Sequence, residues 1–397
     1  MNTITQEIVY ALRKVLGDPK RRYALHEPTF SGNEWNYVKE CIDTRWVSSA
    51  GKYVDLFEQR LAAIVGCKRA VVVSNGTSAL KICLELAGVR PGDEVIVPTL
   101  TFVATANAVS HLGASVHLVD SNEQDLGIDA EKLDTYLEKI CRFNSTGCVN
   151  RATGRKISAI VPVHIFGHPC DIESIRRIGG KYNIPIVEDA AEALGSRCHG
   201  RHVAWNTHLA AMSFNGNKIV TTGGGGAILC NDDSIADLAK HITTTAKVPH
   251  AWEYYHDRVA YNFRLPNLNA ALGCAQLEQL EQFLTAKRFL ANKYRVAFSD
   301  VQQLRFFCEG TNIQSNYWLN AIILDYANKS VRDEILEELN RQQLQSRPAW
   351  TLMHQLPMYQ DMPAMDLSCA ESLVYRIVNL PSSVDLLHET SNDTSSP

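Results

Sequence analysis

Short β-branched apolar runs alternate with longer amphipathic segments from about Ala70 to Asp232. This alternation is typical of βαβ units and predicts a mostly parallel sheet covered by helices, so we expect an α/β fold. The expected strands are Ala70–Val73, Glu94–Val97, Ser115–Val119, Ile157–Val163, Ile184–Glu188, Ala210–Ser213 and Gly226–Leu229. The expected helices between them, each with a Ser, Thr or Asp near its start, are Ser78–Ala87, Phe102–His111, Ala130–Cys141 and Asp171–Lys181.

The pattern changes after about Thr245, where a stretch rich in proline, histidine and aromatic residues leads into a long helical pattern. The elements expected there are a helix at Asn269–Phe298, a strand at Tyr317–Leu324, a helix at Ser330–Gln343 and a strand at Tyr375–Leu380. We therefore expect a large α/β domain at 1–250, with a helical extension at 1–27, and a smaller C-terminal α+β domain at 251–388. The polar residues 389–397 are expected to be a disordered tail.

Composition and charge exclude several classes of protein. With 45% hydrophobic and 21% charged residues among 397, the chain is an ordinary globular protein. A net charge of −4 gives no basic field for nucleic acid or an anionic membrane. No apolar run approaches the roughly 18 residues that span a bilayer, and the N-terminus lacks a signal-peptide core. We expect a cytoplasmic protein without nucleic-acid or membrane partners.

The cysteines and histidines do not form a recognisable metal motif. Eleven cysteines, an odd number, fit reduced cytosolic thiols better than a disulfide framework. The closest mixed clusters, His164/His168/Cys170 and Cys198/His199/His202, lack the paired spacing of zinc ribbons and fingers. The sequence therefore predicts no metal site.

A lysine follows one expected strand in a polar turn, in the stretch Ser213–Gly226, and four glycines come soon after it. Lys218 could form an imine with an aldehyde, a task that suits a compact amine. The alternative is a surface lysine before a glycine loop. A glycine run without the order of a nucleotide-binding motif does not decide between them.

Two acids end the expected strand in the stretch Ile186–Ser196. Ligands gather at the carboxyl ends of parallel strands, where Asp189 could hold a protonated heterocyclic nitrogen, as in the partnership of aspartate with the pyridinium of pyridoxal phosphate (PLP). Asp189 could equally cap the start of a helix.

A third stretch, Val73–Leu80, runs from a strand through Gly76 and Thr77 into a helix. Backbone N–H groups and the dipole at such a helix start form an anion site, although a simple helix cap fits as well. A phosphate cradle, an imine lysine and a pyridinium aspartate are together the parts of one cofactor site, which is why the three stretches reinforce one another.

In their order and spacing these stretches resemble the DegT/DnrJ/EryC1/StrS sugar aminotransferase family of fold-type-I PLP enzymes. The resemblance covers nearly the whole chain, and further matching segments are Pro98–Asn107, His164–His168, Tyr261–Leu265, Ser315–Trp318 and Arg347–Trp350. It implies a large domain with a central sheet, a smaller C-terminal domain, PLP as cofactor and L-glutamate as amino donor.

The resemblance also implies roles for individual residues. Lys218 resembles the lysine that carries PLP, Asp189 the partner of its ring nitrogen, and Phe102 the aromatic residue that stacks on the ring, unless it is an ordinary core phenylalanine. The expected phosphate ligands are Gly76, Thr77, Ser213 and Asn262. In the family the last of these comes from the neighbouring subunit, so a homodimer with shared active sites is implied.

Two departures from the commonest family pattern bear on the substrate: Glu192 stands where many members have Gln or His, and Asn215-Gly216-Asn217 replaces a Phe-Pro-Thr-type run. In both departures the chain is similar to aminotransferases of the bacillosamine and legionaminic acid pathways. The implied substrate is a nucleotide-linked 2-acetamido-4-keto-2,4,6-trideoxy-hexose, UDP-linked. Glu192 is expected close to the cofactor and sugar, either contacting the sugar or packing beside the ring.

Other functions remain as alternatives. A GDP-perosamine-type or 3-keto sugar aminotransferase would share the same chemistry, whereas a dehydratase of this fold would carry His in place of Lys218. A non-catalytic PLP-binding regulator belongs to a different class, but no helix-turn-helix segment or basic patch accompanies the fold. A dinucleotide-dependent oxidoreductase would need G-x-G-x-x-G where the chain has Ser74-Asn75-Gly76-Thr77.

Overall fold

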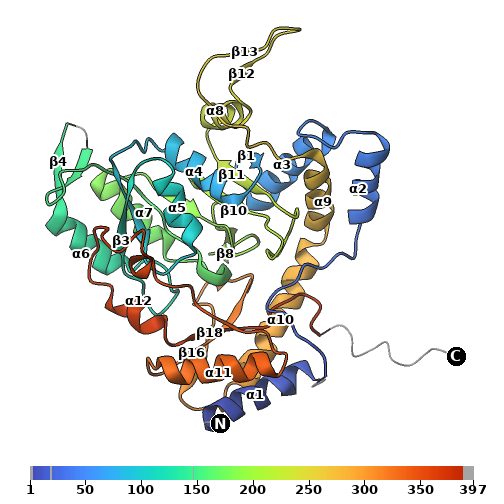
Figure 1. The fold of residues 1–397 in the computed structure, drawn as a ribbon, viewed down its shortest axis with the longest axis vertical. Helices are drawn as coiled ribbons and strands as arrows, with labels where there is room; N and C mark the ends of the chain where they lie inside the picture. The colour runs from blue at the N-terminus through green and yellow to red at the C-terminus, as the bar shows by residue number, and fades with distance from the viewer. Residues whose placement is uncertain (1–2, 18–19, 146, 388–397) are drawn as a thin grey trace.

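Two sheets lie edge to edge in the middle of the structure, a computed structural model that describes residues 3–17, 20–145 and 147–387 (Figure 1). In spatial order the four-stranded sheet consists of β1 (Arg69–Val73), β11 (Gly226–Cys230), β10 (Leu209–Ser213) and β7 (Val187–Asp189). The three-stranded sheet consists of β3 (Ser115–Val119), β2 (Glu94–Pro98) and β6 (Ile157–Ile160). Parallel bridges Ile160–Ile186 and Val163–Asp189 join them. Only the pairs of β11 are antiparallel, which confirms the expected mostly parallel arrangement.

Helices bury both faces of these sheets, because successive residues of a strand point to opposite sides and here both sides are apolar. In β1, Val71 and Val73 belong to one buried cluster, and Ala70 and Val72 belong to another. One face packs against α4 (Gly76–Leu86), α5 (Val103–Ser110) and α8 (Asp233–Thr243). The other face packs against α3 (Lys52–Val65), α6 (Ala130–Ile140), α7 (Ile172–Tyr182) and α9 (Asn267–Glu278). Outside α9 lies α2 (Glu34–Asp43).

A third, antiparallel sheet lies below the two central ones in Figure 1. Its order is β14 (Leu304–Phe306), β16 (Asn320–Leu324), β18 (Ile377–Leu380) and β17 (Arg347–Pro348). Helices α10 (Leu280–Ala297), α11 (Lys329–Arg341) and α12 (Ser368–Leu373) accompany it. Helix α1 (Thr3–Leu16) packs through Ile8 and Leu12 into the same core as α10 and α11. The domain boundary near residue 250 stays a prediction, and the expected tail at 389–397 lies outside the described residues.

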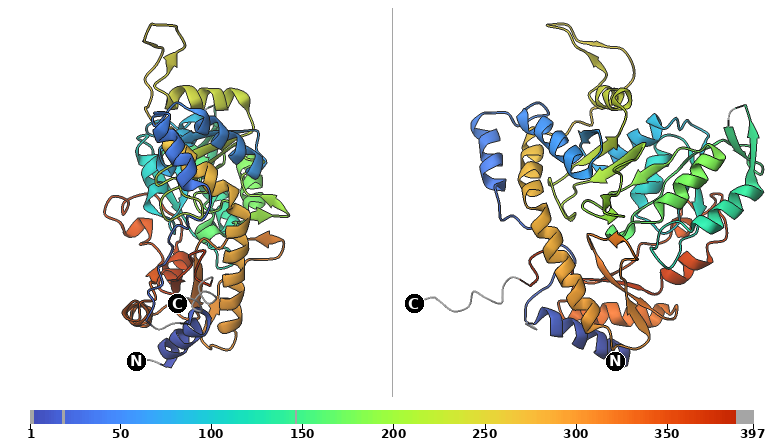
Figure 2. Two further views of the ribbon diagram at one scale, coloured as in Figure 1. Left: turned by 90° about the vertical axis from the view of Figure 1, so that its right-hand side faces the viewer. Right: turned by 180° about the vertical axis from the view of Figure 1, so that it is seen from behind.

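The remaining strands form small ribbons. They are the hairpin of β4 (Cys141–Asn144) and β5 (Gly147–Asn150), the hairpin of β12 (Lys247–Val248) and β13 (Tyr255–His256), and a three-stranded ribbon of β15 (Ile313–Gln314), β8 (Arg197–Cys198) and β9 (Arg201–His202). The β12–β13 hairpin projects beyond α8, away from the body of the protein (Figures 1 and 2). Among the described residues, no helix has both the length and the apolar character needed to cross a membrane.

Several expected elements have different bounds in the structure, among them the following three. The helix predicted at 269–298 is two helices, α9 and α10, which meet at Gln279 and run nearly end to end along one edge of the molecule (Figure 2). The strand predicted from Tyr317 begins at Asn320, because Tyr317 has a φ of 47° and the Asn316 side chain accepts a hydrogen bond from the Trp318 N–H. Regular pairing of β6 ends at Ile160, before Pro162, which has no N–H to donate.

A buried lysine links α10 to the loops before β16 and after β18. Lys287 is 0% exposed, and its Nζ donates to the carbonyl oxygens of Trp318, at 3.2 Å, and Ser382, at 2.5 Å. Burial lowers the pKa of Lys287 to about 7. The side chain thus holds the backbone of Trp318, at the cost of desolvating an amine.

This lysine predicts a pH dependence of stability. Between about pH 7 and about pH 10 the unfolded chain binds a proton at Lys287 that the folded chain has lost, so the free energy of unfolding should rise with pH by up to about 1.4 kcal/mol per unit. Denaturant unfolding of wild type and Lys287→Met across this range isolates the contribution. Parallel pH profiles for the two proteins would contradict it.

Candidate active site

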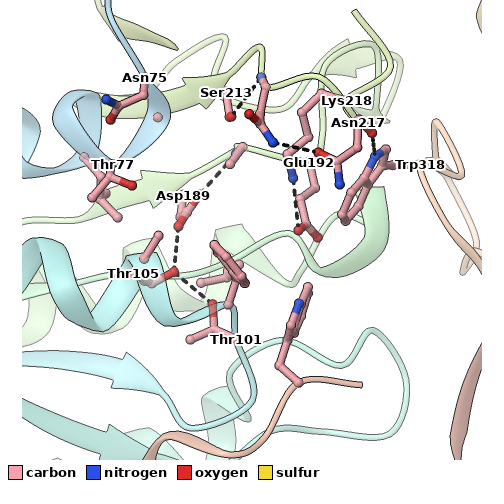
Figure 3. A pocket seen from close by; sticks show the side chains of 18 residues that line it. Asn75, Thr77, Thr101, Thr105, Asp189, Glu192, Ser213, Asn217, Lys218 and Trp318 are labelled. Atoms are coloured by element: carbon pink, nitrogen blue, oxygen red, sulfur yellow. Dashed lines mark hydrogen bonds and ion pairs between the residues drawn. The ribbon is translucent and has the colours of Figure 1, made fainter. Parts of the chain in front are cut away.

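A cavity of about 340 Å³ opens at the carboxyl ends of β7 and β10. Its lining comes from the turn between β1 and α4, the start of α5, the end of β7 and the loop after β10, with Trp318 and Trp350 from the C-terminal part of the chain (Figure 3). Seven of the predicted site residues line it: Gly76, Thr77, Phe102, Asp189, Glu192, Ser213 and Lys218. Asn262 does not.

Lys218 lies in the turn that follows β10, where its backbone N–H donates to the Asn215 carbonyl. Its Nζ is 3.3 Å from Oε1 of Glu192 and 3.7 Å from the centre of the Trp318 ring. The indole in turn donates from Nε1 to the Asn217 carbonyl, at 2.7 Å, and so anchors the turn directly before the lysine. The surface-lysine alternative is therefore wrong, since the amine points into a cavity and has an acidic and an aromatic neighbour.

The Glu192 carboxylate is buried between two partners, the Lys218 amine and the Phe166 N–H, which donates to Oε2 at 2.8 Å. Burial raises the pKa of Glu192, and the positive charge of Lys218 acts against that rise. The Lys218 amine and the Glu192 carboxylate thus form a buried ion pair inside the cavity.

Asp189 ends β7, and its carboxylate accepts hydrogen bonds from Thr105 Oγ1 at 2.8 Å and from the Ala191 N–H at 3.1 Å. Turns rather than a helix follow it, so the helix-cap alternative is wrong. Burial raises the pKa of Asp189, and those two hydrogen bonds oppose the rise. Asp189 has no ion-pair partner within 4.0 Å among the described residues. A protonated ring nitrogen would supply the cation that this carboxylate lacks.

The anion cradle is built where β1 meets α4. Asn75 caps the helix, its side chain accepting from the Ser78 N–H at 2.8 Å. A Cβ at Gly76 would lie only 2.8 Å from Cβ of Ser213, so only glycine lets the helix start come this close to β10. Free N–H groups at this helix start, with the Thr77 and Ser213 hydroxyls, suit a phosphate.

Aromatic rings form the other walls. Phe102, 52% exposed, precedes α5 and lies 6.3 Å between ring centres from Trp350, so it is not an ordinary core phenylalanine. Asn262 is exposed, and its Oδ1 accepts from Arg264. Within one chain it stays outside the cavity, and its role toward a neighbouring subunit stays a prediction.

The lining residues that sequence reasoning did not name as site residues include four whose polar or aromatic side chains contact other groups of the site: Asn75, Thr105, Trp318 and Trp350. All four lie inside segments that carried the resemblance. For Thr105, Trp318 and Trp350, however, nothing about the residue type indicates that the side chain belongs to a binding site. The exception is Asn75, a good helix cap directly before the glycine. Thr105 becomes visible only when the fold brings α5 beside β7.

The donors present fit PLP: an amine for its carbonyl carbon, a buried unpaired carboxylate for its ring nitrogen, a helix start for its phosphate and a half-exposed phenylalanine for its ring face. Together with the mostly parallel sheet they define a PLP-dependent aminotransferase of fold type I. Residues 28–394 match the DegT/DnrJ/EryC1/StrS aminotransferase family, and the chain belongs to that family of sugar aminotransferases.

The relatives agree with this class. GDP-perosamine synthase of Vibrio cholerae is 37% identical over 361 residues, which cover 90% of this chain and 93% of the relative. GDP-perosamine synthase of Escherichia coli O157:H7 is 35% identical, covering 92% and 94%. Among solved structures, the aminotransferase TlmJ of Streptoalloteichus hindustanus superposes with a TM-score of 0.81 at 25% identity, covering 90% and 93%. Helicobacter pylori PseC, with a TM-score of 0.82 at 24% identity and coverage of 93% and 98%, shares the fold.

The hydrogen bond from Thr105 predicts a graded series of defects. Asp189→Asn removes the charge that would face the ring nitrogen of bound PLP and should lower kcat about a thousandfold, several kcal/mol at about 1.4 kcal/mol per tenfold. Thr105→Val removes one bond to that charge and should lower kcat about tenfold to a hundredfold. Steady-state rates with glutamate measure both.

Thr101→Val is the matched control, because the Thr101 hydroxyl bonds Thr105 and not Asp189 (Figure 3). It should keep kcat within about threefold of wild type. A loss below tenfold in Asp189→Asn would mean that this carboxylate serves only the local turn.

Proposed function

We propose that this protein transfers the amino group of L-glutamate to the C4 ketone of a UDP-linked 2-acetamido-4-keto-2,4,6-trideoxy-hexose and so forms the 4-amino sugar. The proposal rests on where the two departures from the commonest family pattern lie in the structure. Glu192, Asn215 and Asn217 all line the cavity that holds Lys218, where they can meet the sugar. Departures at the reacting centre favour the substrate of the subgroup that shares them.

The chain's own groups divide the work. When bound, PLP supplies the carbon that carries the amino group between the two substrates and a ring that takes up negative charge. Nζ of Lys218 accepts the proton from Cα of glutamate in the first half-reaction and delivers a proton to C4 of the sugar in the second. Asp189 keeps a negative charge beside the ring nitrogen, and Thr105 orients that carboxylate.

Glu192 controls the protonation of the lysine in this mechanism. Its Oε1 lies 3.3 Å from Nζ, close enough to hold the amine in one position and to exchange a proton with it. The ring of Trp318 shields the other side of Nζ from water, and Phe102 and Trp350 form the opposite wall. A dry, pre-positioned amine is what proton transfer at carbon needs.

The second candidate is a GDP-linked 4-keto-6-deoxy sugar with a 2-hydroxyl group. The names of the relatives favour it, since the two GDP-perosamine synthases are 37% and 35% identical to this chain over the aligned residues. The two candidates use the same chemistry at C4 and differ at C2 and in the nucleotide.

Substrate choice separates them. A site that hydrogen-bonds the 2-acetamido group leaves buried polar atoms unpaired with the 2-hydroxy sugar, at roughly 1–3 kcal/mol for each unsatisfied group. We expect kcat/KM to favour the UDP-linked 2-acetamido sugar by at least about tenfold. Initial rates with glutamate and each nucleotide sugar, with products identified by mass spectrometry and NMR, give the answer. Equal turnover, or preference for a 3-keto sugar, would overturn the substrate and leave the aminotransferase class intact.

We also propose a homodimer in which Asn262 of each chain binds the cofactor phosphate in its partner's site. The exposure of Asn262 and its absence from the cavity of its own chain support this arrangement. A twofold-symmetric interface would place both copies in equivalent positions.

Complementation tests the shared sites. Lys218→Ala should abolish turnover, and Asn262→Asp should repel the phosphate and leave little activity. When the two variants are unfolded and refolded together, mixed dimers contain one site with both native residues, and statistical mixing should restore about a quarter of wild-type activity. Wild type treated in the same way controls for refolding. A mixture no more active than the two variants separately would show that Asn262 does not act across the dimer.

A further inference from the structure

A second cavity, of about 220 Å³, lies among the start of α7, the β8–β9 hairpin and the segment before β15. It shares no lining residue with the active-site cavity. Its walls are rich in groups that bind metals, including His168, Glu173, Cys198, His199 and Cys308. The proposed aminotransferase chemistry uses none of them.

Three of these side chains converge. A carboxylate oxygen of Glu173, Sγ of Cys198 and an imidazole nitrogen of His199 all lie within 4.8 Å of one another. Glu173 stands in the first turn of α7, and Cys198 and His199 come from β8 and the turn after it. The backbone N–H of His199 donates to the Asn312 carbonyl at 2.9 Å, which anchors this turn to the C-terminal part of the chain. The fold thus brings Glu173 beside two consecutive donors that follow it by 25 residues or more in the sequence.

A second observation points to a ligand at the same place. His168 lines this cavity and is 2% exposed, yet neither of its ring nitrogens has a hydrogen-bond partner among the described residues. Burial lowers the pKa of His168 to about 3, so the ring is neutral and can accept as well as donate. Buried polar atoms without partners are rare because they cost free energy. A polar occupant of the cavity would satisfy His168.

We propose that Glu173, Cys198 and His199 bind a zinc-type divalent metal ion, with an open fourth position that faces the cavity. One thiolate, one imidazole and one carboxylate are a donor set that Zn²⁺ accepts, and three protein ligands plus water are the usual form of an open zinc site. A water in the fourth position can bond to His168. Cys198 binds as the thiolate, so its proton passes to solvent when the metal enters.

Such an ion would act on stability. It would connect α7 to the β8–β9 hairpin, and β8 directly follows the segment that carries Asp189 and Glu192. A ligand that binds only the folded state raises the thermal midpoint by mass action. The prediction of no metal site rested on the spacing of Cys and His alone. That spacing could not include Glu173, because this carboxylate comes from α7 and meets Cys198 and His199 only in the folded chain.

The partly exposed thiols make the test specific. Three cysteines are partly exposed, Cys198, Cys308 and Cys369, and the others are buried. Tag-free holoenzyme is stripped with a chelator, loaded with ZnCl₂ and desalted, and its metal content and zinc-edge X-ray absorption are measured. We expect one zinc per chain, one sulfur neighbour at about 2.3 Å and lighter neighbours at about 2.0–2.1 Å.

Variants decide the assignment. Cys198→Ser should lose the sulfur neighbour, and Cys198→Ser, Glu173→Gln and His199→Gln should each weaken zinc binding at least about tenfold in competition with a chromophoric chelator. Cys308→Ser, in the same cavity but outside the cluster, should bind zinc as wild type does. Zinc should raise the thermal midpoint of wild type and of Cys308→Ser only. Less than half an equivalent bound by wild type, a sulfur neighbour retained in Cys198→Ser, or equal losses in Cys308→Ser would overturn the proposal.

Discussion

The buried carboxylate of Asp189 is the constraint on which the active site depends. A carboxylate at the end of a buried strand is unfavourable unless hydrogen bonds and a cation compensate for the lost water. Thr105 and the Ala191 N–H supply the hydrogen bonds, and no ion-pair partner among the described residues supplies the cation. The site is therefore electrostatically incomplete in a way that a protonated heterocycle would correct, which explains why PLP binding and the β7 edge belong together.

The C-terminal part of the chain completes the site rather than merely covering it. Trp318 contacts Lys218 through its ring, and its backbone carbonyl accepts a hydrogen bond from Lys287. Because that lysine is fully buried in α10, the position of the indole is coupled to packing well away from the cavity. A change in the core around α10 can thus alter the surroundings of the Lys218 amine without any change in the residues that line the cavity.

The sequence predicted the parallel core correctly, because it follows from local pattern. The same pattern of strand, turn and residue at the carboxyl end singled out Lys218 and Asp189, which the structure brings together in one cavity and whose roles stay predictions. It could not supply Thr105 or Trp350, whose roles depend on elements meeting in space. The sequence pattern placed the start of the strand too early, at Tyr317. The left-handed backbone of Tyr317 and the hydrogen bond from the backbone N–H of Trp318 to the Asn316 side chain override the apolar run. Glu173 escaped notice for the same reason as Thr105, because a single carboxylate carries no signal until the fold gives it neighbours.

Glu192 connects the chemistry to the choice of sugar. A neutral Gln at this position could position Lys218 but could not take its proton, whereas the carboxylate can do both. One oxygen is committed to the Phe166 N–H and the other lies next to Nζ. A sugar group that entered beside Glu192 would therefore compete with Lys218 for that second oxygen. Under the proposed function, substrate recognition and the protonation of the Lys218 amine would therefore meet at a single carboxylate, and a Gln there would separate them.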